Sequence, residues 1–152
     1  MDHDVLEDIR QLKYRYLRAL DLKLWDEFAD TLTEDVQTNY GAHLTVDGRD
    51  KVVDFMRASL GPAIITVHQV HHPEITVDGD TATGRWYLED KVIVTEQRML
   101  LTGACFYEDE YRRGADGAWR ISKTGYVRSY EAVQSLDDTP SWKLTANRWA
   151  SE

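Results

Sequence analysis

The chain has 152 residues, which is the size of one domain. Its 18 lysines and arginines stand against 27 aspartates and glutamates, and the resulting formal charge of −9 argues against a protein that binds nucleic acid by neutralising phosphates. Hydrophobic residues make up 42% of the chain, which is enough for an independent core and excludes general disorder. We therefore expect a globular domain without a nucleic-acid partner.

The single cysteine, Cys105, cannot form an intramolecular disulfide, and metal sites built from clustered thiolates are excluded for the same reason. Its simplest interpretation is a small buried hydrophobic residue. The N-terminus is acidic, whereas a signal peptide starts with basic residues and an apolar block. No apolar run approaches the roughly 20 residues that span a membrane. These features predict a cytoplasmic protein with no membrane partner.

Apolar residues at spacings of three and four predict a helix over residues 5–20, and a shorter helix follows over 24–32. Asp21 precedes the second helix, where it could serve as its N-cap. Residues 36–40 and 44–46 are compatible with a small two-stranded ribbon. A third helix is predicted over 50–60, because a Gly-Pro pair follows and ends it.

The rest of the domain is predicted to be strand, in four extended runs over 64–77, 81–95, 99–112 and 118–130. Glycines in the turn at residues 78–80 and in the loop at 114–117 allow tight reversals, so an antiparallel meander and an α+β fold are expected. Such strands are roughly 40 to 50 Å long at about 3.3 Å per residue, so the sheet must curl into a cone with a cavity. We expect residues 1–135 to form the domain and 136–152 to form a tail that packs on it or on a neighbouring subunit.

Several polar residues lie where burial would cost energy. In the extended run over 81–95, Asp90 is the only charged residue on its face. A lone buried charge costs energy, so its presence there indicates a functional role, unless that face is exposed to solvent near Asp90. Tyr16 lies on the apolar stripe of the first helix, so its hydroxyl needs an interior partner. Tyr40 closes the first strand and says little alone.

Three histidines lie in one extended segment, and alternation puts His68 and His72 on one face and His71 on the other. Because strand geometry does not let all three converge, we expect no metal site. A single interior histidine paired with a carboxylate is the better hypothesis, since its near-neutral pKa suits proton abstraction, although such pairs also occur in structural cores.

The alternation of inward and outward residues along the last strand leaves the orientation of Arg128 open. Strict alternation groups Trp119, Ile121 and Val127 on one face and turns Arg128 away from the core. A bulge near Gly125 would shift the phase and bring Arg128 inward.

Three stretches together resemble a known family: residues 13–16 (Lys-Tyr-Arg-Tyr) with Asp21, residues 83–90 (Thr-Gly-Arg-Trp-Tyr-Leu-Glu-Asp), and residues 124–128 (Thr-Gly-Tyr-Val-Arg). They resemble the bacterial bile acid 7α-dehydratases, in the SnoaL-like group of the nuclear transport factor 2-like superfamily. The resemblance spans most of the chain up to about residue 130. It implies a cone-shaped α+β barrel, N-terminal helices packed on a curved, mostly antiparallel sheet, and commonly a homotrimer, with a dimer as the alternative.

The resemblance also implies roles for individual residues. His68 matches the catalytic histidine and Asp21 the aspartate that pairs with it, while His71 could compete with His68 because this segment is unusually rich in histidine. The other positions that match are Tyr16 as a catalytic residue and Tyr40, Asp90 and Arg128 as substrate-binding residues.

The implied function is a hydro-lyase that needs no cofactor or metal and removes water from a hydroxylated 3-keto-4-ene steroid or bile acid intermediate. A small hydrophobic polycycle is the expected partner. A ketosteroid isomerase, a polyketide cyclase-like enzyme and a non-catalytic binding or assembly subunit are the alternatives, since one fold hosts many functions.

Overall fold

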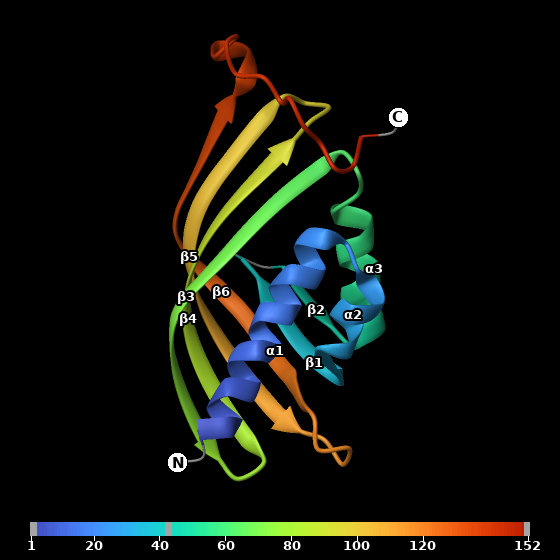
Figure 1. Cartoon of the computed structure of the whole chain (residues 1–152), viewed down its shortest axis with the longest axis vertical. Coiled ribbons are helices and arrows are strands. Elements are labelled where there is room, and N and C mark those ends of the chain that lie inside the picture. Colours follow the sequence, from blue (N-terminus) through green and yellow to red (C-terminus); the bar gives the residue numbers. More distant parts are fainter. Residues whose placement is uncertain (1–2, 42–43, 151–152) are drawn as a thin grey trace.

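The computed structural model describes residues 3–41 and 44–150, and three helices in it lie against one face of a strongly bent sheet (Figure 1). The sheet contains six strands. In chain order the elements are α1 (His3–Leu22), α2 (Trp25–Asp30), β1 (Leu32–Tyr40), β2 (Thr45–Asp47), α3 (Arg49–Ser59), β3 (Ile64–Asp78), β4 (Thr81–Val94), β5 (Met99–Arg113), β6 (Trp119–Ser135) and the short 3₁₀ helix η1 (Leu136–Asp138).

The strand order is β2-β1-β6-β5-β4-β3. Strands β3 to β6 form an antiparallel meander, while β1 pairs in parallel with β6. The α+β class and the curled, mostly antiparallel sheet are therefore confirmed. Helix α1 crosses the concave face along the lower half of the long strands, whose upper parts continue past it (Figure 1).

The core lies between α1 and the sheet. The apolar stripe of the first helix is fully buried at Ile9, Leu12 and Tyr16, as its spacing predicts. From the sheet, alternate residues of β4 (Ala82, Trp86 and Leu88) face this stripe and are buried. Packing against this face removes the apolar stripe from water, and this burial stabilises the helix. No helix among the described residues is long and apolar enough to cross a membrane.

A bulge in β6 decides which of its residues face the core. Glu110 pairs with Lys123 and Tyr111 with Ile121, so Ser122 is an extra residue on β6. The phase is inverted between this bulge and a second one at Ser129, since Cys105 pairs with Arg128 and Ala104 with Tyr130, and Val127 in this stretch is 75% exposed. The expected grouping of Val127 with the inward-facing Ile121 is therefore wrong. The alternative, a bulge that shifts the phase and brings Arg128 inward, is confirmed, and the bulge lies at Ser122, three residues before Gly125.

A second irregularity bends β3. The register shifts between His71 and Glu74, and His72 has a positive φ of 28°. His72 is exposed, and its ring stacks on that of Tyr87 with 5.7 Å between centroids, on the convex face. The expectation that His68 and His72 share a face is wrong, because the extra residue turns His72 outward.

Candidate active site

One row of cross-strand partners carries polar residues across the concave face. His68 pairs with Asp90, Asp90 with Gly103, and Gly103 with Glu131, on β3, β4, β5 and β6. Asp90 is only 6% exposed, so its predicted place on the inner face is confirmed and the alternative of a solvent-exposed face is wrong. Paired positions on one face bring Cβ atoms to about 4.5–5.5 Å, so His68 and Asp90 are immediate neighbours.

His68 and Asp21 form a hydrogen-bonded pair between β3 and the last turn of α1. The distance from His68 Nδ1 to Asp21 Oδ1 is 2.6 Å, and the backbone N–H of His68 donates to Asp21 Oδ2 over 2.9 Å. The hydroxyl of Thr66 donates to Asp21 Oδ1 over 2.8 Å. Asp21 therefore lies within α1 and does not cap the second helix, whose N-cap is Leu24.

This arrangement determines which histidine nitrogen is basic. An ionised carboxylate only accepts hydrogen bonds, so Nδ1 of His68 carries the proton and Nε2 keeps its lone pair. The side chains of His68 and Asp21 are 13% and 23% exposed, so the pair is largely buried but still accessible to solvent. Within residues 3–41 and 44–150, Nε2 of His68 has no hydrogen-bonding partner and is free for a ligand.

His71 lies on the opposite face of β3, where its Nε2 is 3.5 Å from Glu89 Oε2. Its side chain is 42% exposed. The structure therefore brings His68, and not His71, together with the carboxylate of α1.

Asp90 and Arg128 form a bidentate ion pair beside the dyad. Arg128 Nη1 and Nη2 donate to the two carboxylate oxygens over 2.5 and 2.9 Å. These bonds to Asp90 stabilise the cation and raise the pKa of Arg128 above its ordinary value. Gly103 makes the geometry possible, because a Cβ there would overlap Arg128 Nη1 and lie 3.0 Å from the carbonyl oxygen of Tyr130.

Two of the predicted site residues are tyrosines from different elements, and they meet in the core below this ion pair. The hydroxyls of Tyr16 on α1 and Tyr40 on β1 are 2.7 Å apart. Burial raises the pKa of both, so both remain neutral donors. Tyr126 connects them to the ion pair, since its ring centroid is 6.2 Å from that of Tyr40 and the Arg128 guanidinium lies 5.5 Å above it.

Sequence reasoning missed a buried charged network deeper in the cone. Lys13 Nζ is 2.8 Å from Asp109 Oδ2, and neither side chain is exposed. Asp109 also accepts hydrogen bonds from Tyr111 and Thr124, over 2.9 and 2.6 Å. The signal was present in the sequence, because Lys13 follows Ile9 by four positions and so lies on the same stripe.

Above the polar row, the concave face becomes mostly apolar. The next row consists of Thr66, Val92, Leu101 and Val133, and the row beyond it of Ile64, Val94, Met99 and Ser135. Val133 is 60% exposed, so this surface is not filled by the helices. An apolar concave surface with a few convergent polar groups is typical of small-molecule sites.

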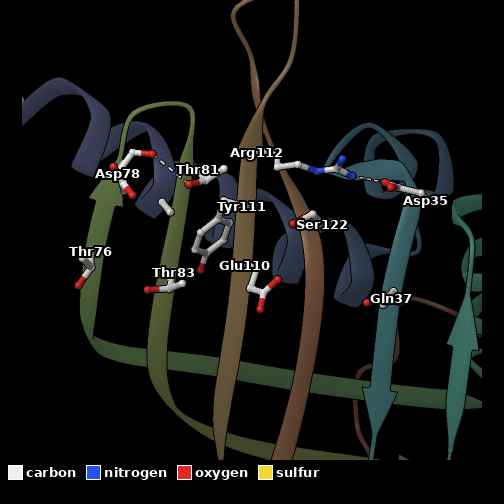
Figure 2. A pocket seen from close by; sticks show the side chains of 11 residues that line it. Asp35, Gln37, Thr76, Asp78, Thr81, Thr83, Glu110, Tyr111, Arg112 and Ser122 are labelled. Atoms are coloured by element: carbon white, nitrogen blue, oxygen red, sulfur yellow. Dashed lines mark hydrogen bonds and ion pairs between the residues drawn. The ribbon is translucent and has the colours of Figure 1, made fainter.

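A separate, polar pocket of about 660 Å³ lies mainly on the convex face (Figure 2). It includes Asp35, Glu110, Arg112 and Ser122, and none of the six predicted site residues lines it. In the part of the chain that the structure describes, no three His, Cys, Asp or Glu side chains are grouped so that they could hold a metal ion.

Comparison with known sequences gives a family and relatives. A model of the SnoaL-like domain matches residues 4–125. Uncharacterised proteins of Mycobacterium bovis and Mycobacterium tuberculosis are 30% identical over 128 residues, which cover 83% of this chain and 86% of theirs.

Solved structures share the fold. A hexachlorocyclohexane dehydrochlorinase (LinA, type 2) gives a TM-score of 0.78 at 21% identity, covering 86% of this chain and 89% of its own. A putative scytalone dehydratase from Novosphingobium aromaticivorans gives 0.76 at 18%, covering 93% and 90%. A Catenulispora acidiphila protein in complex with S-DNPA gives 0.72 at 19%, covering 93% and 100%. The chain belongs to the SnoaL-like domain family.

Proposed function

We propose that this member of the SnoaL-like domain family is a hydro-lyase that needs no cofactor and removes water from a 3-keto-4-ene steroid or bile acid intermediate with a 7-hydroxyl group. The observation that carries the proposal is the His68–Asp21 pair, with a free Nε2, below an apolar concave surface. This is a general base in a site suited to a hydrophobic polycycle.

In the first step, Nε2 of His68 removes the proton at C6, which is acidic because the enone spreads the resulting charge to the C3 oxygen. The C6–H electron pair moves into the dienolate, so the substrate itself is the electron sink. Asp21 holds the ring in the required tautomer and stabilises the imidazolium, with Thr66 and the His68 backbone fixing the carboxylate.

The developing negative charge on the C3 oxygen needs a hydrogen-bond donor. Tyr40 is 8% exposed and Tyr16 is fully buried, so Tyr40 is assigned the contact with substrate. Tyr16 is bonded to Tyr40 at 2.7 Å and positions its hydroxyl. Donors that are already oriented cost no reorganisation during the reaction.

In the second step the C7–O bond breaks, its electron pair leaves with the hydroxyl, and the dienolate collapses to a longer conjugated dienone. The proton that completes the water molecule comes from the His68 imidazolium. Asp90 and Arg128, beside His68, bind and orient the leaving hydroxyl. Eliminations are also the reactions named for two structural neighbours, the dehydrochlorinase and the putative scytalone dehydratase, which supports the reaction class.

The test is a panel of 7-hydroxy-3-keto-4-ene steroids incubated with pure protein, followed by loss of water in the mass spectrum and by the new conjugated chromophore. We expect His68→Ala to lower turnover by about 10² to 10⁴-fold with the fold retained. His71→Ala is the matched control, since His71 lies on the other face, and should keep wild-type turnover. Near wild-type dehydration by His68→Ala would overturn the assignment.

A ketosteroid isomerase or polyketide cyclase-like enzyme is the alternative that the same base and tyrosine pair would serve. The panel separates dehydration from both, because moving a double bond leaves the mass unchanged and a steroid whose rings are already closed gives a cyclase nothing to cyclise. A binding or assembly subunit would show no turnover and a stable complex with another chain.

We also propose that the protein is a homotrimer, with a dimer as the alternative, held through the convex face of the sheet. Phe106, Val127 and Tyr130 there are 53%, 75% and 53% exposed. Light scattering on the wild type and on Val127→Glu tests this, with a monomeric wild type as the contrary result.

A further inference from the structure

The segment of residues 139–150, here called the strap, passes over the upper part of the concave face, beyond the end of α1 (Figure 1). It follows η1 at the end of β6 and runs on the helix side of the sheet toward the start of β3 (Figure 1). At its far end the ring of Trp149 lies 5.0 Å from Lys23 Nζ, in the turn between α1 and α2. The family match ends at residue 125, so the strap lies outside the shared region.

Both ends of the strap are fixed at the same row of the sheet. The row consists of Ile64, Val94, Met99 and Ser135. Leu136, next to Ser135, is 2% exposed and starts the path on β6. At the other edge Lys23 Nζ, which contacts Trp149, donates to the carbonyl oxygen of Ile64 over 2.8 Å. The strap therefore spans the concave face above the polar row, from β6 to β3.

We propose that the strap is the outer wall of the substrate site and that the contact of Trp149 with Lys23 holds it closed. The inference rests on the proposed function only for the nature of the substrate. The wall lies over an apolar surface that the helices leave open, where Ile64, Val94 and Met99 are partly buried and Val133, at 60% exposure, is left uncovered. A polycyclic ligand beneath it would lie between the strap and the dyad.

Chain length alone does not hold the strap in place. Four neighbouring strands span roughly 14 Å at about 4.8 Å between strands, whereas ten extended residues reach roughly 33 Å. The position therefore depends on contacts that the strap makes along its path, among them that of Trp149 with Lys23. Burial lowers the pKa of Lys23, as expected for an ammonium drawn out of water by its neighbours.

The anchor is also close to the chemistry. Lys23 follows Asp21 by two residues, and the carbonyl that Lys23 binds belongs to the same strand as His68. The strap and the dyad therefore share one corner of the molecule, where α1 meets β3.

Two measurements that need no turnover test the proposal. The first is limited trypsin digestion, with cleavage after Lys143 followed by mass spectrometry. The second is the dissociation rate of 1-anilinonaphthalene-8-sulfonate, an apolar polycyclic probe, measured by stopped-flow fluorescence. A cation–π contact at a partly exposed site is worth about 0.5–1 kcal/mol, so Trp149→Ala should accelerate both rates about two- to fivefold. Trp149→Phe keeps an aromatic face and should match the wild type.

A second variant, truncated after Ser141, removes most of the strap and should release the probe at least as fast as Trp149→Ala. Far-UV circular dichroism and urea midpoints check that each variant is folded. Unchanged cleavage in Trp149→Ala would overturn the anchor, and unchanged probe release in the truncated chain, or no saturable probe binding to the wild type, would overturn the wall. Failure of the steroid panel alone would refute the dehydratase proposal and leave these results standing.

Discussion

The buried pair of Lys13 and Asp109 allows a quantitative prediction about stability. Both side chains are fully buried, 2.8 Å apart, so replacing Lys13 by Met leaves a carboxylate without its counter-charge in the core. Breaking such a pair costs about 3–5 kcal/mol. Tyr111 and Thr124 still donate to Asp109, which places the expected loss near the lower end, at about 3 kcal/mol. For a domain of this size that is a fall in Tm of about 6–12 °C.

Urea unfolding of the wild type, Lys13→Met, Asp109→Asn and the double variant measures the effect as a thermodynamic cycle. The double variant should lose less than the sum of the single variants by roughly 1–3 kcal/mol, because removing the second partner also removes the uncompensated charge. Glu7→Ala, at a 55%-exposed carboxylate on the same helix, is the control and should change little. A loss below about 1 kcal/mol for Lys13→Met, or strict additivity, would refute this reasoning.

Three further predictions concern the site and its surroundings. Thr66→Val removes one hydrogen-bond donor to the Asp21 carboxylate, so we expect the free energy of unfolding in urea to fall by about 1.5–3 kcal/mol and kcat to fall with little change in KM. Thr66→Ser keeps the hydroxyl and should restore both. A Thr66→Val variant with wild-type stability and kcat would contradict this role of Thr66. Gly103→Ala should displace Arg128 from Asp90, with overpacking costing about 1–3 kcal/mol, whereas Gly61→Ala, which meets no atom within 4 Å, is the neutral control. Burial raises the pKa of four tyrosines in the folded state, Tyr16, Tyr40, Tyr107 and Tyr111, so at high pH the folded protein keeps tyrosine protons that the unfolded chain loses. The free energy of unfolding should therefore fall as the pH rises above about 10, by up to about 1.4 kcal/mol per pH unit for each of these residues. The absorbance of tyrosinate should show that these four residues ionise later than exposed tyrosines.

Local sequence determined the elements and much of the inner surface. The stripe that contains Tyr16 and the alternation that contains Asp90 are properties of one helix and one strand, and each fixes a burial pattern without reference to any neighbour. The lengths of the extended runs predicted a curled sheet for the same reason. Strand β6 nevertheless runs to Ser135, beyond the predicted end, because pairing with β5 continues there.

Only the tertiary structure decided which side chains meet. The bulge at Ser122 turns Arg128 inward, and the irregularity after His71 turns His72 outward, because both depend on how a strand pairs with its neighbour. Asp21 had two open roles in the sequence, as a cap or as a partner of His68, and the position of β3 against the last turn of α1 selected the second. The contact of Lys13 with Asp109 and that of Lys23 with Trp149 join residues about a hundred positions or more apart, which no local pattern can reveal.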